Sequence, residues 1–157
     1  MQGIAKTPAS SHLLITNPDC KKLPERTGKS FHHITAKRLY LCWRTRQDIQ
    51  TAVAFLYTRV KSPDTDSKKL ARVIHYLRGT QELTLMIEPS DHPNWWVDSS
   101  YAVHPDMRSH SVIVMMLGKG AVYSSSCKQK QNTKSSTKAE LVGIDDAMGQ
   151  VLWTEHF

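Results

Sequence analysis

Two carboxylates in the second half of the 157-residue sequence are the residues best suited to metal chemistry. Asp98 falls inside the apolar stretch NWWVDSSYA, where β-propensity disfavours aspartate and burial without a partner is costly. Glu140 stands where a later helical pattern begins. Mg²⁺ prefers oxygen ligands, and a pair of such ions can activate water and stabilise the leaving oxygen of a phosphodiester. A strand carboxylate and a helix-start carboxylate could therefore bind Mg²⁺ together.

Each carboxylate also has an ordinary structural interpretation. The run Thr137-Lys138-Ala139-Glu140 has the spacing of a capping box, in which the glutamate bonds back to the start of its own helix. The spacing alone favours this capping role for Glu140. Asp98 could equally be a solvent-facing carboxylate on an edge strand. From the residues alone, both interpretations of each carboxylate stay open.

The histidines predict no metal site. The pairs His32/His33 and His104/His110 have no cysteine or acidic partner at ligand spacing. Adjacent histidines on a helix also point in different directions. We interpret these side chains as surface or core residues.

Helical periodicity fills the first half of the chain. Residues 1–30 contain three prolines and show no clear periodicity, so they are predicted to be an extended or disordered lead-in. A helical segment is predicted over 31–80. Its first helix begins at Phe31 and its second covers 47–60. A third ends at Gly79, with Asp64 or Asp66 as possible caps and one apolar face made by Leu70, Val73, Ile74 and Leu77.

Strand patterns dominate the remainder, residues 81–157. Alternating apolar residues predict strands over 83–88, 94–101, 111–117 and 121–126. Gly118-Lys119-Gly120 predicts a hairpin between the last two strands. A final helix is predicted to run towards Phe157, with an apolar stripe made by Leu141, Ile144, Met148, Val151 and Leu152. The pattern indicates an α+β fold.

The positive charge is concentrated in the first part of the chain. The formal net charge is +7, but residues 1–90 hold 15 Lys and Arg against 7 Asp and Glu, whereas residues 91–157 hold 6 against 7. A basic surface attracts polyanions, of which nucleic acid is the commonest, although a solvated lysine-rich helix surface gives the same composition.

The remaining composition excludes several protein classes. No apolar run is long enough to span a membrane, and the N-terminus lacks the pattern of a signal peptide. The three cysteines are odd in number and far apart, which argues against a disulfide framework. We therefore expect an intracellular protein, cytoplasmic or nuclear, with no membrane partner.

Several sequence blocks resemble one known family. The ribonuclease H region of copia-type retrotransposon polyproteins closely resembles WWVDSSYAVHPDMRSHS, LGKGAVYSSSCKQKQNTKSSTKAELVGIDDA and VLWTEHF. The end of the same element's reverse transcriptase is similar to FHHITAKRLYLCWRTRQDIQTAVAFLYTRV and KKLARVIHYLRGT. The blocks follow the family's order over residues 31–157. The resemblance implies the end of a reverse transcriptase joined to an incomplete ribonuclease H-like antiparallel meander with one helix.

The resemblance also implies an activity and a site. The family cleaves the RNA strand of RNA–DNA hybrids with two Mg²⁺ ions held by four carboxylates. Asp98 matches the first of these carboxylates and Glu140 the second, so both are expected to be catalytic metal ligands. The positions that line the nucleic-acid backbone in the family match Ser99, Ser100, Ser136 and Thr137. The expected partner is an RNA–DNA hybrid or another nucleic acid.

The match is incomplete in ways that bear on activity. The third and fourth carboxylates of the family lie beyond Phe157, so we expect little or no cleavage by the isolated chain. An inert or purely nucleic-acid-binding relic of the element is the alternative. The sequence also has Lys138 where the family commonly has an acidic residue, Gln47 where it has proline and Val112 where it has glycine. The strand around Asp98 would keep an exposed edge, which favours self-association.

Overall fold

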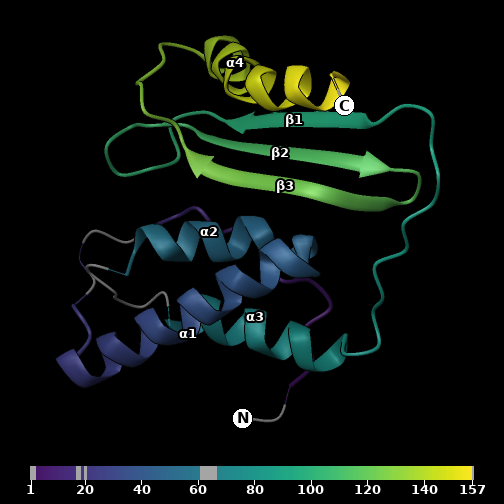
Figure 1. Cartoon of the computed structure of the whole chain (residues 1–157). Helices are drawn as coiled ribbons and strands as arrows, with labels where there is room; N and C mark the ends of the chain where they lie inside the picture. Colours follow the sequence, from purple (N-terminus) through teal and green to yellow (C-terminus); the bar gives the residue numbers. More distant parts are fainter. Residues whose placement is uncertain (1–2, 17–18, 20, 61–66, 157) are drawn as a thin grey trace. The chain divides into compact units, whose positions relative to one another are not determined.

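The computed structural model describes residues 3–16, 19, 21–60 and 67–156, which form two compact units. Unit 1 is Met1–Leu85 and unit 2 is Met86–Phe157. Unit 1 is helical, whereas unit 2 contains a sheet and one helix (Figure 1). The chain is therefore α+β, as the sequence patterns predicted. None of the helices in the described ranges combines the length and apolar character needed to cross a membrane.

Unit 1 is built from short helical segments around one apolar cluster. Its elements are α1 (Glu25–Arg44), the single 3-10 turn η1 (Gln47–Ile49), α2 (Gln50–Thr58) and α3 (Ser67–Gly79). The three predicted helices are thus confirmed, and the predicted caps Asp64 and Asp66 lie outside the described residues. Buried apolar side chains of this cluster come from all of these elements, and include Phe31, Ile49, Val53, Phe55, Leu56, Leu70 and Val73.

The predicted lead-in is partly structured. Helix α1 begins at Glu25, six residues before the predicted start at Phe31. Upstream of it, Leu13 is buried in the apolar cluster. Helix α1 follows directly after Pro24, and proline is tolerated at a helix start because the backbone N–H it lacks would have no partner there. The lead-in therefore contributes to the core of unit 1.

Unit 2 contains an antiparallel meander followed by a helix. The strands are β1 (Asn94–Ser100), β2 (His110–Leu117) and β3 (Gly120–Lys128), in the order β1-β2-β3. The predicted hairpin joins β2 to β3, and Gly118 at the turn has φ of +60°, a conformation that favours glycine. Helix α4 (Ser136–Glu155) follows β3 and lies along β1 (Figure 1).

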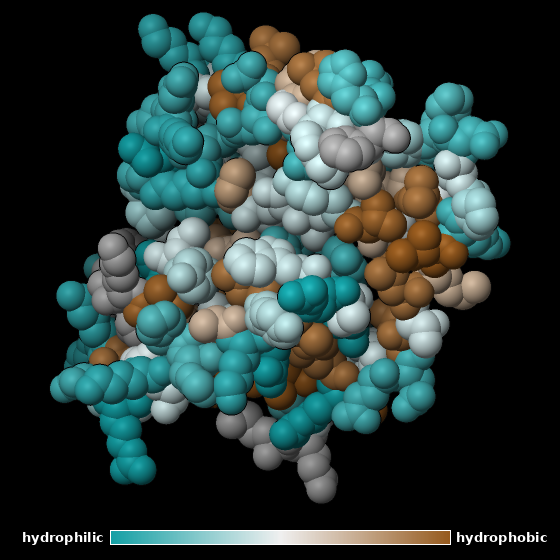
Figure 2. Space-filling model, viewed as in Figure 1, coloured by the Kyte–Doolittle hydropathy of each residue, from teal (hydrophilic) through white to brown (hydrophobic). Residues whose placement is uncertain are grey.

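The predicted strand over 83–88 does not form. This segment has no regular secondary structure, and among the described residues no strand pairs with it. Its end contacts the β2–β3 turn instead, where Lys119 Nζ lies 2.7 Å from Glu88 Oε1. Of the apolar residues that made the alternating pattern, Leu83 and Ile87 are more than half exposed and Leu85 is 38% exposed. Figure 2 shows apolar side chains gathered on the side where this segment runs.

Helix α4 packs on the sheet with a different face from the predicted one. The side chains buried against the sheet belong to the small residues Ala139, Gly143 and Ala147. The predicted apolar stripe, by contrast, is between 40% and 60% exposed at Leu141, Ile144, Met148 and Leu152. Small residues let the helix backbone approach the strands closely, and that approach decides which face is covered.

Candidate functional site

Asp98 is an exposed residue on the edge strand of the sheet. Strand β1 pairs only with β2 among the described residues, and Asp98 stands opposite Val112 in that pairing. The side chain is exposed and makes no hydrogen bond or ion pair within the described part of the chain. The carboxylate therefore avoids the burial cost expected from its apolar neighbours, and both of its oxygens are free for a ligand.

Glu140 does not cap its own helix. The N-cap of α4 is Ser135, whose Oγ accepts a hydrogen bond from the backbone N–H of Lys138 at 3.3 Å. Glu140 therefore lies beyond the capping positions, and the capping box suggested by Thr137 and Glu140 is wrong. The Glu140 side chain is exposed and has no partner among the described residues. Its oxygens are available for a ligand as well.

The two carboxylates are carried on neighbouring elements, and they start from different faces of the sheet. Val97 and Ser99 both have side-chain atoms near Gly143 of α4, so these two side chains of β1 point towards the helix. Successive side chains of a strand alternate between faces, which places Asp98 on the opposite face. A metal ion bound by both Asp98 and Glu140 would therefore have to lie at the free edge of β1, where side chains from the two faces of the sheet can meet.

The four predicted nucleic-acid-binding residues fall into two groups. Ser136 and Thr137 are exposed in the first turn of α4. Ser100 is half-buried at the end of β1, and Ser99 is only 8% exposed. The Ser99 hydroxyl lies 3.1 Å from that of Ser111, inside the unit. The Ser99 side chain therefore links strands β1 and β2, whereas the side chains of the other three residues are at least partly accessible to a ligand.

A buried glutamine that the sequence patterns did not single out ties α4 to the sheet. Gln129 is 1% exposed, and its Nε2 donates at 2.8 Å to both Ser111 Oγ and the Ala139 carbonyl. The same nitrogen lies 3.4 Å from Ser99 Oγ. This amide therefore fixes the start of α4 next to the end of β1. Its surroundings consist of residues distant in sequence, so no local pattern could have found it.

A second buried polar cluster closes the end of the meander. His104 Nε2 lies 3.0 Å from His110 Nδ1, and His110 Nε2 lies 2.8 Å from Ser126 Oγ. Both histidines are less than 5% exposed. Burial lowers the pKa of His110 to about 4, and the neighbouring His104 adds to the shift. The pair noted in the sequence is thus structural, and within the described residues no group of three or more metal-ligating side chains is found.

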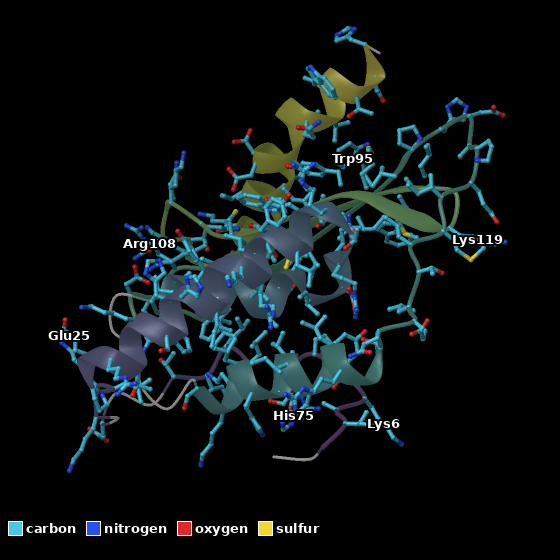
Figure 3. The ribbon with its side chains drawn as sticks, turned by 60° about the horizontal axis from the view of Figure 1, so that its bottom comes forward. Lys6, Glu25, His75, Trp95, Arg108 and Lys119 are labelled. Carbon is cyan, nitrogen blue, oxygen red and sulfur yellow. The ribbon has the colours of Figure 1, made fainter. Side chains whose placement is uncertain are left out.

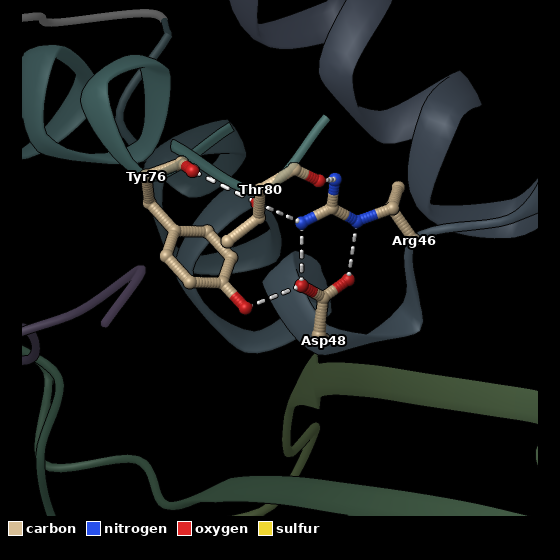
Figure 4. A network of polar contacts seen from close by, with 4 residues as sticks. All are labelled: Arg46, Asp48, Tyr76 and Thr80. Carbon is tan, nitrogen blue, oxygen red and sulfur yellow. Dashed lines mark hydrogen bonds and ion pairs between the residues drawn. The ribbon is translucent and has the colours of Figure 1, made fainter. Parts of the chain in front are cut away.

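Unit 1 has a polar network of its own, which joins its loops (Figure 4). Arg46 donates two hydrogen bonds to Asp48, Nε to Oδ1 at 2.9 Å and Nη2 to Oδ2 at 2.8 Å. The Tyr76 hydroxyl donates to Asp48 Oδ2 at 2.8 Å, and Arg46 also donates to Thr80. Burial acts to raise the pKa of Asp48, but the hydrogen bonds from Arg46 and Tyr76 outweigh it and lower the pKa. These contacts hold the α1–α2 connection against the end of α3.

Comparisons with known protein families, with curated proteins and with solved structures found no match for this chain. The function of the chain is therefore inferred from its sequence blocks and from the geometry of β1 and α4.

Proposed function

We propose that unit 2 is the first part of a ribonuclease H-like domain from a copia-type retrotransposon polyprotein, and that unit 1 is the end of its reverse transcriptase. The ancestral activity is Mg²⁺-dependent cleavage of RNA in RNA–DNA hybrids. One observation carries the proposal: an antiparallel meander is followed by a helix, and the carboxylates on the first strand and near the helix start have no partner among the described residues. That arrangement agrees with the sequence blocks that resemble the family.

The donor chemistry of the two carboxylates suits the metal that the family uses. Mg²⁺ is commonly bound through one or two carboxylates and keeps several of its waters. Asp98 and Glu140 are exposed, and no other side chain competes for their oxygens among the described residues. When bound, the ions would supply an activated water and charge stabilisation. Exposure of both carboxylates also means that water competes strongly, so we expect weak metal binding.

Cleavage by these two carboxylates alone should be weak or undetectable. Residues that act as a unit lose orders of magnitude in rate when some of them are missing. In this sequence, Asp98 and Glu140 are the residues that match the family's carboxylates. Asp145 and Asp146 belong to the same helix as Glu140 and do not match the family order. The chain thus has residues that match two of the four carboxylates of the family's hydrolytic site.

Metal binding and hybrid cleavage test the proposal together. Binding of Mn²⁺, used as a spectroscopic probe for Mg²⁺, should weaken at least several-fold in Asp98→Asn and in Glu140→Gln. Asp91→Asn and Asp145→Asn remove the same charge from exposed positions beside β1 and on α4, and should leave binding unchanged. Any cleavage of a labelled RNA–DNA hybrid should disappear with Asp98→Asn. Equal binding by all four variants would overturn the proposal.

A non-catalytic role in nucleic-acid binding is the second candidate, and the charge distribution favours it. Unit 1 contains 15 Lys and Arg against 6 Asp and Glu, whereas unit 2 contains 6 against 8. A basic unit binds polyanions electrostatically, and such affinity falls steeply as salt is added. Hybrid affinity that does not change with salt would exclude this role. Salt-sensitive binding without cleavage or metal binding would favour it over the nuclease.

A further inference from the structure

A hollow in unit 1 lies between helix α3 and the N-terminal segment. Its volume is about 530 Å³, and its lining includes Lys6 from the segment and Lys68, Arg72 and His75 from α3. The three α3 residues follow one another at spacings of four and three, so they share one face of the helix. Figure 3 shows Lys6 and His75 close together at this place. Four nitrogen-bearing side chains therefore surround one hollow.

Specific contacts hold the N-terminal segment in position along α3. Arg72 Nη2 donates to Thr7 Oγ1 at 2.9 Å, and Arg72 Nε donates to the Thr7 carbonyl at 3.2 Å. One helical turn away, Lys69 Nζ donates to the Ile15 carbonyl at 2.7 Å. Gly3 lies next to the His75 ring, at the other side of Lys6. The chain on both sides of Lys6 therefore lies against α3, which places Lys6 at the hollow.

The positive charge around the hollow is not neutralised within the described structure. None of the described residues that line the hollow has a carboxylate side chain. Arg72 is bonded to neutral groups of Thr7, and Lys6 and Lys68 have no hydrogen bond or ion pair among the described residues. Like charges held near one another repel, and an anion between them removes the repulsion. The ammonium groups of lysine are compact point charges with several donors, which suits a phosphate.

We propose that this hollow binds a phosphate of a nucleic-acid backbone, with Lys6, Lys68 and Arg72 as its cationic contacts. His75 supplies a ring nitrogen at the edge of the hollow. The volume lies within the range of small-ligand sites, which leaves space for a phosphodiester and its sugar. Backbone contacts of this kind position a protein on nucleic acid without reading its sequence. This inference rests on the proposed nucleic-acid partner, and it assigns one phosphate of that partner to the hollow beside α3.

The salt dependence of binding tests this assignment. Affinity of the full chain for a short, labelled RNA–DNA hybrid is measured by fluorescence anisotropy in EDTA, over a series of NaCl concentrations. The double variant Lys6→Gln/Lys68→Gln should bind about tenfold more weakly, and its slope of log K against log salt should be smaller by about 0.9, the value for one lost phosphate contact. Circular dichroism confirms that the variant is folded.

A matched pair of lysines controls for total charge. Lys22→Gln/Lys37→Gln removes two exposed lysines of unit 1 that do not line the hollow. This control should bind clearly more tightly than the hollow variant. Lys68→Arg keeps the charge and should retain wild-type affinity. If the control loses as much affinity and slope as the hollow variant, the charge acts as a whole and the assignment is wrong.

Competing anions separate the possible sources of the phosphate. Hybrid should displace inorganic phosphate from the wild-type hollow, and vesicles containing phosphatidylserine should bind the wild type and the hollow variant equally. Vesicle binding that depends on Lys6 and Lys68, without hybrid binding that does so, would overturn the assignment in favour of a lipid surface. Because EDTA removes divalent metals, these results do not depend on Asp98 or Glu140. The nuclease proposal and the phosphate site can therefore fail separately.

Discussion

The two units of this chain are stabilised by different kinds of interior. Unit 1 has one continuous cluster of buried apolar side chains, contributed by its helices and by Leu13 of the N-terminal segment. Among the described residues of unit 2, the only buried apolar side chains are Ile113, Ala139 and Ala147. The interior of unit 2 is instead mostly polar, and its buried members are Ser99, His104, Ser109, His110, Ser111 and Gln129.

This difference predicts different responses to change. Apolar burial is non-directional, so a core of this kind tolerates many side chains of suitable volume. Buried hydrogen bonds are directional, and loss of one partner leaves a desolvated polar group behind. Unit 2 should therefore be more sensitive to pH and to small polar substitutions than unit 1. The proposed metal ligands, Asp98 and Glu140, belong to unit 2, the unit that should be more sensitive to substitution.

The largest effect is expected in the apolar cluster of unit 1. Leu56→Ala removes a fully buried side chain from α2, and should lower the free energy of unfolding by about 3 kcal/mol through lost burial and a residual cavity. Denaturant unfolding measures this change. Leu141→Ala, at a position that is 60% exposed, should change the free energy far less. Equal losses of unfolding free energy in both variants would contradict the expectation that buried apolar side chains contribute more to stability than exposed ones.

Acidification should destabilise unit 2 through the buried His110. The pKa of His110 is about 4 in the folded chain against an ordinary value of 6.5, so the unfolded state binds the proton more readily. Stability should therefore fall as the pH falls from about 6.5 to about 4, by on the order of 3 kcal/mol in total. Urea unfolding at several pH values measures the change.

A substitution isolates the contribution of this histidine. His110→Gln removes the titrating ring, so the free energy of unfolding should become flatter between pH 6.5 and 4. An unchanged pH dependence in His110→Gln would contradict the assignment.

The buried amide that joins α4 to the sheet should be worth less than this. Gln129→Ala removes one buried donor from both Ser111 Oγ and the Ala139 carbonyl, which should lower the free energy of unfolding by about 2 kcal/mol. Amide hydrogen exchange in the first turns of α4 should accelerate with it. Gln131→Ala, two residues later and exposed, should change neither quantity. Similar losses of unfolding free energy in both variants would show that the buried hydrogen bonds of Gln129 do not stabilise unit 2.

The smallest effect separates the two possible caps of α4. Ser135→Ala removes the hydroxyl that accepts from Lys138 N–H, and should lower stability by about 1 kcal/mol. Thr137→Ala, the capping position suggested by the sequence spacing, should have little effect. Thermal unfolding monitored by circular dichroism measures both. A larger loss of stability in Thr137→Ala than in Ser135→Ala would show instead that Thr137 caps the helix and that Glu140 takes part in a capping box.

Elements with strong local signals could be predicted from the sequence. The helical periodicity of unit 1, the strands that became β1 to β3 and the Gly118 turn all depend on residues that are close in sequence. The segment 83–88 shows the limit of this reasoning. Its alternation is the same as in a half-buried strand, but a strand also requires a neighbour with free hydrogen-bonding groups, which local sequence does not reveal.

The secondary structure that carries the two candidate carboxylates could be predicted, but their relative geometry could not. Asp98 was placed on a strand and Glu140 in a helix, as the structure has them. The orientation of α4 was not predictable, because large apolar residues suggested one buried face and the small residues Ala139 and Gly143 made another. Gln129 escaped notice for a related reason: its partners come from β2 and α4, and only the folded chain brings them together.

The close approach at Gly143 has a consequence for experiments that substitute many positions at once. A Cβ atom there would collide with Ser99 Oγ and press on Ser111 and Val97, so a larger residue must either displace these packed side chains or push α4 away from β1. Such a shift would also displace Glu140, one helical turn earlier. In a deep mutational scan, Gly143 should therefore score as intolerant as a ligand-binding residue, although its own atoms contact no ligand.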